Sequence, residues 1–280
     1  TIKLGLDGIA FDKSLIQKIW DRKFSILDFK ENKNNSQESR NTIYCYTDGS
    51  RVKDSQVGCG YVIKKASECL SSHQEYLGTN ATVFQAEVLA IQRTCSALAK
   101  RINQKIIIRS DSQAALLALK ATDVDSKLVL DCIKDLNKLG SKNKVSLQWI
   151  KAHCGHEGNE EADQLAKAGA EKIALGPEPF LPVPNSYMHK ITKISLEKVW
   201  NSMWQNLKSC RQTKQWFGKP SNKIDKKLGK SNRFELGRIV QFITGHCNLN
   251  RHKNLQDKSI APTCRHCKED EETPWHLVTS

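Results

Sequence analysis

Residues 149–163 have the sequence WIKAHCGHEGNEEAD and join a strand predicted over 144–150 to a closing helix predicted over 160–172. His153 stands on a Gly-bounded loop before this helix, and Asp163 stands within the helix. A histidine can carry a proton near neutral pH, because its ordinary pKa is about 6.5. The stretch therefore places a proton carrier close to a carboxylate, which gives weight to three acidic residues upstream.

Upstream of this stretch, strand patterns and helix patterns follow one another. Short β-rich runs at 43–47 and 57–63 lie on either side of an Asp-Gly-Ser turn region, and 105–109 is an Ile-rich strand. Helical spacing of apolar residues covers 82–100, 112–120 and 124–139. The order of elements is βββ-α-β-α-α-β-α, which predicts an α/β fold with a mixed sheet flanked by helices.

Three acidic residues stand at strand ends or in the first helix. Asp48 ends the first strand, Asp111 follows the Ile-rich strand, and Glu87 lies inside the first helix. If the two strands are parallel neighbours, their spacing of about 4.8 Å brings both carboxylates within reach of shared metal ions. Carboxylates this close repel one another unless a divalent cation neutralises them, and oxygen-only ligands favour Mg²⁺ or Mn²⁺ over zinc.

Each residue also has an ordinary structural interpretation. An Asp-Gly pair such as that at Asp48 is typical of a turn, and Asp111 is typical of the N-cap of the helix that follows it. Glu87 alone is typical of a solvated helix position, and His153 of a surface loop. Asn159 is predicted to cap the N-terminus of the closing helix.

The order of these motifs resembles that of the type I ribonuclease H family. Its opening Thr-Asp-Gly-Ser, its helix Glu, its Ser-Asp-Ser and its closing His-x-Gly-His-x-x-Asn-x-x-x-Asp all occur here in the same order, over about residues 42–171. The resemblance implies a mixed five-stranded sheet and a Mg²⁺-dependent endonuclease that cleaves the RNA strand of an RNA/DNA hybrid. Its products would carry 5′-phosphate and 3′-hydroxyl ends.

The same resemblance assigns roles to particular residues. Two Mg²⁺ or Mn²⁺ ions would be held by four carboxylates, namely Asp48, Glu87, Asp111 and Asp163. His153 would assist proton transfer and product departure. Contacts to the substrate would come from Gly49, Ser50, Gln113 and Asn159.

Composition and charge narrow the class of protein. The chain has 280 residues, of which 39% are hydrophobic, and 44 Lys and Arg against 30 Asp and Glu give a net charge of +14. A globular protein is expected, and a collagen-like or disordered chain is excluded. The basic excess favours a polyanionic partner, such as nucleic acid or an anionic membrane surface, although surplus lysines can also serve solubility alone. No run approaches the ~18 apolar residues of a membrane span, so we expect no membrane partner and an intracellular protein, in nucleus or cytoplasm. Four cysteines that lie alone in apolar runs are predicted to be reduced core thiols: Cys45, Cys59, Cys95 and Cys132.

Composition shifts divide the chain into four predicted segments. Residues 1–41 form an N-terminal extension that ends in the polar linker ENKNNSQESRN, and 42–171 form the ribonuclease H domain. Residues 172–194 form a Pro-rich linker, because prolines exclude regular helix. Residues 195–280 form a basic helical region, since 171–280 hold 19 Lys and Arg against 10 Asp and Glu. An initial Thr and a final motif that breaks off favour a piece of a longer polyprotein.

The C-terminal region ends in a second candidate metal motif. Cys264, Cys267 and His276 have the spacing of three ligands of a tetrahedral zinc site, which needs a fourth. Candidates for the fourth ligand are His246, Cys247 and His266. The segment also resembles the tail that follows ribonuclease H in the polyproteins of insect-type non-LTR retrotransposons. Reduced thiols without metal are the alternative interpretation.

Two other functions compete with a ribonuclease H of retroelement origin. A non-catalytic nucleic-acid-binding module would rely on the basic tail, yet the four carboxylates and His153 are all present. An integrase or transposase would carry its last Glu on the final helix, where this sequence has Asp163. The enzyme is therefore the favoured prediction, and it requires a divalent metal ion and Asp111.

Overall fold

The structure is a computed structural model that describes residues 10–27, 39–52, 56–66, 68–152, 154–172, 181–219, 228–229 and 231–280. Contacts between residues divide the chain into two compact units, the first ending at Lys190 and the second beginning at Ile191. Within the described ranges, no helix has both the length and the apolar character that a bilayer crossing requires.

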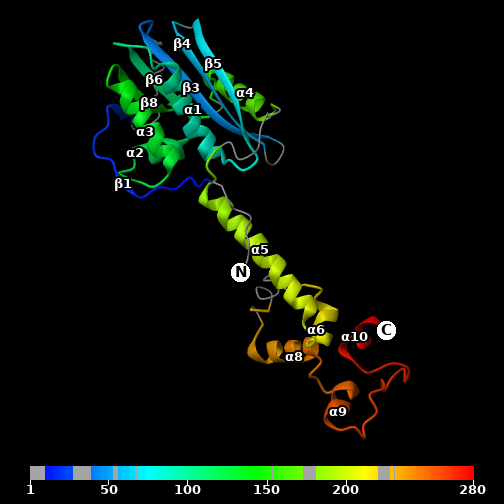
Figure 1. The fold of residues 1–280 in the computed structure, drawn as a ribbon. Helices are drawn as coiled ribbons and strands as arrows, with labels where there is room; N and C mark the ends of the chain where they lie inside the picture. The colour runs from blue at the N-terminus through cyan, green and yellow to red at the C-terminus, as the bar shows by residue number, and fades with distance from the viewer. Residues whose placement is uncertain are drawn as a thin grey trace. The chain divides into compact units, whose positions relative to one another are not determined.

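The first unit is built on a six-stranded sheet with the strand order β2-β8-β6-β3-β4-β5 (Figure 1). Its strands are β2 (Phe24–Ile26), β3 (Thr42–Val52), β4 (Gln56–Lys65), β5 (Glu68–Gly78), β6 (Lys105–Ser110) and β8 (Lys144–Trp149). Strands β2, β8, β6 and β3 pair in parallel, whereas β4 pairs antiparallel with both β3 and β5. The predicted α/β class and mixed sheet are confirmed. The sheet has one strand more than the five expected, because β2 pairs beside β8.

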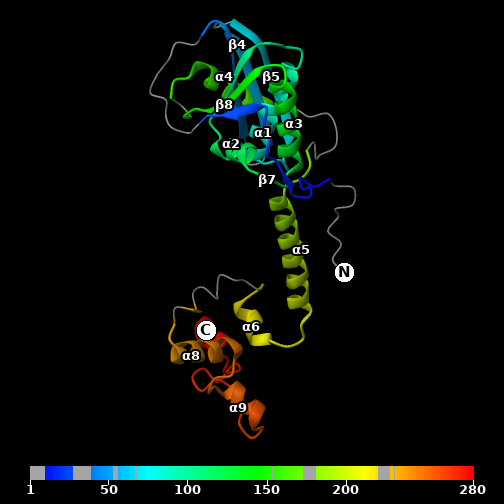
Figure 2. The same ribbon diagram turned by 90° about the vertical axis from the view of Figure 1, so that its left-hand side faces the viewer.

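Helices cover both faces of this sheet (Figures 1 and 2). One face carries α1 (Val83–Ala97), α2 (Gln113–Lys120) and α3 (Lys127–Gly140), and the other carries α4 (Glu157–Ala170). Side chains alternate along β3, so Ile43 and Cys45 join the larger core, while Tyr44 and Tyr46 join a smaller cluster with Ala162 of α4. The four cysteines predicted in the core are all buried and free.

Serine and threonine side chains fix where three of these helices begin. Thr82 caps α1 and forms a capping box with Gln85, and Ser112 caps α2. Ser126 caps α3, so this helix begins at Lys127 and not at Val124 as predicted. Val124 instead belongs to the short strand β7 (Asp123–Val124), which pairs with β1 (Gln17–Lys18).

The turn predicted after Thr47 is wrong, because β3 continues without interruption to Val52. Asp48 pairs with Gly60 of β4, and Gly49 pairs with Cys59. Gly49 is needed for space and not for a turn: a Cβ atom there would lie 2.7 Å from the backbone nitrogen of Glu87. The missing side chain therefore allows α1 to pack directly against β3.

Residues 10–27, which the sequence assigned to an extension, pack on the first unit. Oδ1 of Asp12 accepts a hydrogen bond from the Ser126 hydroxyl at 2.9 Å. The Arg22 guanidinium donates to two carbonyl oxygens at the end of α2, and β2 extends the sheet. The unit therefore begins before Thr42, the predicted start. The rest of the predicted polar linker, 28–38, lies outside the described residues.

The linker predicted over 172–194 is shorter than expected. Helix α5 (Asn185–Asn206) begins directly after Pro184, whose carbonyl accepts from the Tyr187 amide. A proline fits this position because the first turn of a helix leaves its amide groups without partners. Residues 173–180 of the linker lie outside the described part of the chain.

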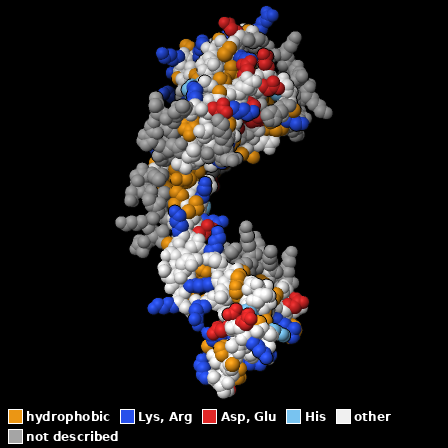
Figure 3. Space-filling view, turned by 90° about the vertical axis from the view of Figure 1, so that its right-hand side faces the viewer, with side chains coloured by type: hydrophobic (Ala, Val, Ile, Leu, Met, Phe, Trp, Pro, Cys, Tyr) orange, Lys and Arg blue, Asp and Glu red, His pale blue; other side chains and the backbone are white. Residues whose placement is uncertain are grey.

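The second unit is helical and has little core. After the shared helix α5 it contains α6 (Arg211–Trp216), α8 (Arg233–Thr244), α9 (Asn250–Gln256) and α10 (Pro274–Thr279). The Trp216 ring packs against Phe242 and against the edge of Trp275, which joins α6, α8 and α10. Apolar side chains of α5, including Trp200 and Met203, are exposed among lysines (Figure 3).

Candidate active site

The register of two parallel strands brings Asp48 and Asp111 side by side. Thr47 of β3 pairs with Ser110 of β6, and each aspartate is the next residue along its strand direction. Their carboxylates and that of Glu87 offer oxygen atoms that all lie within 4.8 Å of one another. Three of the four carboxylates predicted to hold metal are therefore brought together by the structure.

Glu87 reaches this edge because α1 packs directly on Gly49. Its side chain is only 5% exposed, so it is not the solvated helix position of the alternative interpretation. Asp48 is also buried, at 7% exposed. The Oε2 atom of Glu87 is buried and has no hydrogen-bond partner in the described residues. A buried carboxylate oxygen without a partner carries a free-energy cost that a cation at this position would remove.

Burial and mutual repulsion change the acid strength of these groups. Burial first, and the negative charges of Asp111 and Asp163 next, raise the pKa of Asp48 to about 7. The pKa of Glu87 is raised well above its ordinary value by burial first and by Asp48 and Asp111 next, although the Gly49 amide and the Ser110 hydroxyl oppose the shift. Without a cation, the cluster therefore holds protons that isolated carboxyl groups would lose.

Asp163 lies close to the cluster but is held by another partner. It stands on α4, and its Oδ2 accepts from Nζ of Lys167, one turn later, at 2.7 Å. It is not among the three carboxylates within 4.8 Å of one another in the described residues, although its charge raises the pKa of Asp48. The fourth predicted ligand is therefore a neighbour of the cluster, with a lysine paired to it.

Asp111 is positioned by two residues and does not cap a helix. Ser112 is the N-cap of α2, so the capping interpretation of Asp111 is wrong. Oδ2 of Asp111 accepts from Nδ2 of Asn159 at 3.2 Å, and its backbone carbonyl accepts from the indole nitrogen of Trp149 at 3.0 Å. Trp149 can do this because it pairs with Ser110 at the end of β8.

Asn159 does not cap α4, contrary to the prediction. The helix begins at Glu157 with His156 as its N-cap, so Asn159 lies inside the first turn. It is 4% exposed, and its Oδ1 atom is buried without a hydrogen-bond partner in the described residues. The side-chain nitrogen of Asn159 therefore faces the carboxylate of Asp111, while its side-chain oxygen can still accept a hydrogen bond.

The other predicted site residues occupy different surroundings. Gly49 is buried beneath α1, Ser50 is half-buried on β3, and Gln113 is exposed in the first turn of α2. These three residues stay predictions as substrate contacts. His153 lies outside the described residues, between Ala152 and Cys154.

The donor set fits a hard divalent cation. All the converging ligand atoms are carboxylate oxygens, which suit Mg²⁺ or Mn²⁺, and there is no thiol or imidazole among the three. The unpartnered oxygen of Glu87 and the raised pKa of Asp48 both mark a site with an excess of negative charge. A divalent cation at this cluster would offset that excess of negative charge.

The sequence reasoning missed Lys167 and the positioning roles of Trp149 and Asn159. The spacing of Lys167 from Asp163, one helical turn, is the signal that could have identified the ion pair. The contact from Trp149 depends on the register between β6 and β8, and no local pattern shows it. The contact from Asn159 depends on where α4 begins, which was predicted three residues too late.

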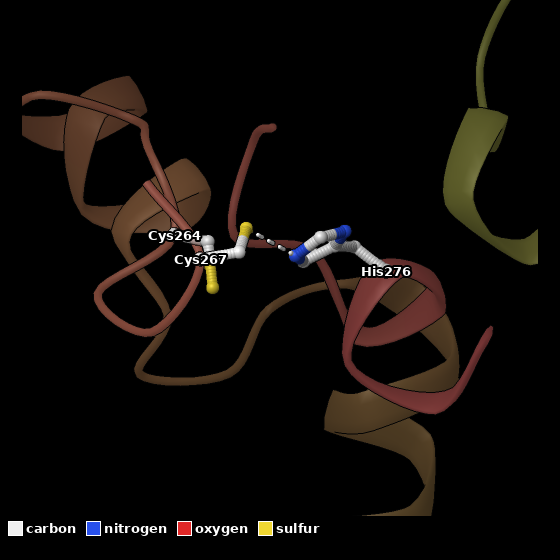
Figure 4. A group of neighbouring side chains, drawn as sticks. All are labelled: Cys264, Cys267 and His276. Atoms are coloured by element: carbon white, nitrogen blue, oxygen red, sulfur yellow. Dashed lines mark hydrogen bonds between the residues drawn. The ribbon is translucent and has the colours of Figure 1, made fainter. Parts of the chain in front are cut away.

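The second predicted metal motif is also brought together, in the second unit. Cys264 Sγ, Cys267 Sγ and a ring nitrogen of His276 all lie within 4.8 Å of one another (Figure 4). In the described residues, the proposed fourth ligands are not part of this group, namely His246, Cys247 and His266.

Comparison with known proteins points to the same segment. The family model for RNase H matches residues 40–171. RNase H1 from the halophilic archaeon Halobacterium salinarum is 22% identical, with a TM-score of 0.38, over 46% of this chain and 96% of that one. LC11-RNase H1, solved in complex with an RNA/DNA hybrid, is 21% identical, with a TM-score of 0.39, over 46% and 97%.

A third solved structure is the N-terminal RNase H domain of a Mycobacterium tuberculosis protein, fused to maltose-binding protein. It is 19% identical, with a TM-score of 0.40, over 46% of this chain and 94% of that one. In chain order, the matched residues run from β3 through β8 and include the helices α1 to α4. Residues 40–171 are therefore similar to the RNase H family, and they form a mixed β-sheet flanked by helices.

Proposed function

We propose that this protein is an endonuclease that hydrolyses the RNA strand of RNA/DNA hybrids with the help of two divalent metal ions, Mg²⁺ or Mn²⁺. The observation that carries the proposal is the convergence of Asp48, Glu87 and Asp111, with a buried Glu87 oxygen that has no partner. This cluster lies inside the segment that matches the RNase H family.

In the proposed reaction, the carboxylates act as the anchor for the cations. The pKa of Asp48 is raised both by Asp111 of the cluster and by Asp163, so Asp48 is the residue we expect both cations to share. When bound, the two cations would activate the attacking water and stabilise the leaving 3′ oxygen. Asp163 would help to hold the second cation after the ion pair between Asp163 and Lys167 opens or rearranges.

Two further groups of residues have proposed roles around this centre. His153, which precedes α4 in the sequence, would move a proton during product departure. Ser50 and Gln113 would contact the hybrid beside the carboxylates, together with the backbone at Gly49, and Asn159 would hold Asp111 in place. A protein separates RNA from DNA through the 2′-hydroxyl, which polar groups at such positions can bind.

We also propose an origin in a retroelement polyprotein, with other domains of that polyprotein as neighbours. The order of a ribonuclease H domain and a Cys/His motif supports this. Sequencing the flanking DNA tests it: a reverse-transcriptase reading frame upstream is expected, and an unrelated gene on both sides would contradict the origin without affecting the enzyme.

The central experiment is a cleavage assay with the full chain. An end-labelled RNA/DNA hybrid, dsRNA and dsDNA are incubated with Mg²⁺ or with EDTA. We expect Mg²⁺-dependent cutting of the RNA strand of the hybrid alone, with 5′-phosphate and 3′-hydroxyl products. Asp111→Asn should abolish cutting, whereas Asp131→Asn, an exposed acid of α3 paired with Lys134, should leave it unchanged.

The alternative function makes the opposite prediction. A nucleic-acid-binding module would leave every substrate intact and bind it with an affinity that falls with salt, with or without Mg²⁺. If the folded protein cuts nothing while binding in this way, the catalytic proposal is wrong. The basic second unit would then be the functional part of the chain.

A further inference from the structure

Three potential ligand atoms converge in the second unit. Sγ of Cys267 lies 3.2 Å from Nε2 of His276, and Sγ of Cys264 lies within 4.8 Å of both (Figure 4). A tetrahedral zinc ion with Zn–S of about 2.3 Å and Zn–N of about 2.0 Å separates such atoms by roughly 3.5–3.8 Å. A shift of a few tenths of an ångström would therefore bring Cys267 and His276 to zinc-binding separation.

The loop that carries the two cysteines turns its amide groups toward the sulfur atoms. The His266 amide donates to Sγ of Cys264 at 3.4 Å, and the Glu269 amide donates to Sγ of Cys267 at 3.5 Å. Lys268 takes a positive φ of 60°, which allows the chain to fold back around Cys267. Amide donors around two sulfur atoms stabilise thiolates, and the thiolate is the form that binds metal.

The third ligand is oriented by its own helix and by Ser280. Thr273 caps α10 by accepting a hydrogen bond from the His276 amide at 3.1 Å, with Pro274 in the first turn. The Ser280 hydroxyl lies 2.8 Å from Nδ1 of His276, which leaves Nε2 directed at Cys267. A hydrogen bond at the second ring nitrogen is the usual means of orienting a metal-binding histidine.

A buried acid fastens the segment between the cysteines and the histidine. Glu272 is 1% exposed, and its carboxylate accepts from the Asn250 amide at 2.7 Å and from the Arg265 guanidinium at 2.8 Å. These contacts hold the chain entering α10 against the start of α9 and against the cysteine loop. These contacts bring Cys264 and His276 close together, and none of them involves the side chain of either residue.

The few buried residues described in the second unit lie around the three potential ligands. Among its described residues, only Cys264, Glu272, Thr273 and Pro274 are buried, and all lie at or between the three ligands. Small units with so little core are usually stabilised by a disulfide or a metal ion. Both cysteines are free here.

We propose that the second unit binds one zinc ion through Cys264 Sγ, Cys267 Sγ and His276 Nε2, and that this ion joins α10 to the cysteine loop. Two thiolates and an imidazole are soft and borderline ligands that select zinc over Mg²⁺. Three protein ligands leave one tetrahedral position for water or another donor. Cys267 is exposed, so this position can be reached from solvent.

The test uses the full chain and Co²⁺ as a probe, because Co²⁺ bound to thiolate has a charge-transfer absorption that carboxylate ligands cannot produce. We expect one equivalent of Co²⁺ to give this band and one equivalent of Zn²⁺ to remove it. Cys267→Ser and His276→Gln should lose or markedly weaken the band. Cys210→Ser and His252→Gln change an exposed cysteine and a histidine outside the group in the same unit, and should keep it.

Hydrogen exchange gives a second readout on the unaltered chain, in case a variant fails to fold. Zinc should slow exchange of amides over 264–276 and leave those of β6 unchanged, and a chelator should reverse the effect. Absence of the thiolate band together with unchanged exchange would overturn the proposal. So would a band that persists in Cys267→Ser. Neither readout measures cleavage, so this result does not depend on the nuclease proposal.

Discussion

Asn159 of α4 donates a hydrogen bond from Nδ2 to Oδ2 of Asp111, at the end of β6, across 3.2 Å. This contact joins the helix on one face of the sheet to the strand edge where the carboxylates meet. It also fixes the orientation of one carboxylate in a cluster whose members repel one another.

Replacing Asn159 should therefore reduce cleavage without removing a metal ligand. Because loss of a group that orients a metal ligand typically costs about 10- to 100-fold in activity or metal affinity, we expect Asn159→Ala to lose activity in that range. Cleavage rates measured over a Mg²⁺ titration should show a raised Mg²⁺ requirement. Gln164→Ala, an exposed position on the same helix, serves as the control. Equal activity of the two variants would show that Asn159 does not position Asp111.

The raised pKa of Asp48 predicts an unusual pH dependence of stability in the metal-free protein. Folded Asp48 keeps its proton up to about pH 7, whereas the unfolded chain releases it near 3.8. The folded state thus binds more protons between these values, so the free energy of unfolding falls as pH rises from about 4 to about 7. The burial of Glu87 acts in the same direction.

The variant Asp48→Asn isolates this contribution. At pH 8 without metal it should be more stable than the original chain, by on the order of a few kcal/mol, because a buried charge is removed. Mg²⁺ should stabilise the original chain at pH 8 more than at pH 5, and the variant at neither. Urea unfolding measured at several pH values checks this. Identical pH profiles for the two chains would contradict the assignment of the raised pKa to Asp48.

Gly49→Ala should destabilise the first unit and disturb the site together. An added Cβ would lie 2.7 Å from the Glu87 amide nitrogen and 2.8 Å from Cβ of Ala86, so α1 must move away from β3. Overpacking of this kind costs about 1–3 kcal/mol. Urea unfolding gives the stability, and the cleavage assay gives the effect on Glu87. Gly218→Ala, where nothing lies within 4 Å, should change neither.

Asp12→Ala should destabilise the first unit although it lies outside the matched segment. Its carboxylate accepts from the Ser126 hydroxyl and the Leu128 amide, both at 2.9 Å, and from the Gln85 amide at 3.2 Å. Leaving these buried donors without a partner should cost about 1–3 kcal/mol. Hydrogen exchange should locate the effect at the start of α3. An equally large effect of Asp21→Ala, on an exposed residue, would show that Asp12 has no special role.

The features that sequence could predict are those that depend on local pattern or on a known motif. The predicted strands located Asp48 and Asp111, although β3 continues past Asp48 to Val52, and the two residues came together because β3 and β6 are parallel neighbours. Helical spacing located α1, and therefore Glu87, to within a few residues. Burial of Glu87 could not be predicted, because it depends on how closely α1 approaches Gly49.

Other features depend on contacts between distant segments, and these the sequence did not show. Three residues, Phe24–Ile26, are too few for a strand pattern, and they form β2 only because the edge of β8 is available. Asn159 was expected to be a helix cap, because Asn is common there, but the helix begins earlier at Glu157. In both cases a tertiary partner overrides the local preference.

Strand β2 has a consequence for how the chain folds. The Ser25 hydroxyl donates to that of Ser146, across 121 residues of sequence, and no partner for β2 exists until β8 has formed. Pairs this far apart lose much chain entropy before they gain any contact, so they form late. On the ribosome, residues 24–26 are made long before their partner, and we expect this edge strand to dock last. By the same reasoning it should be the first part of the sheet to detach when the protein is heated or stretched.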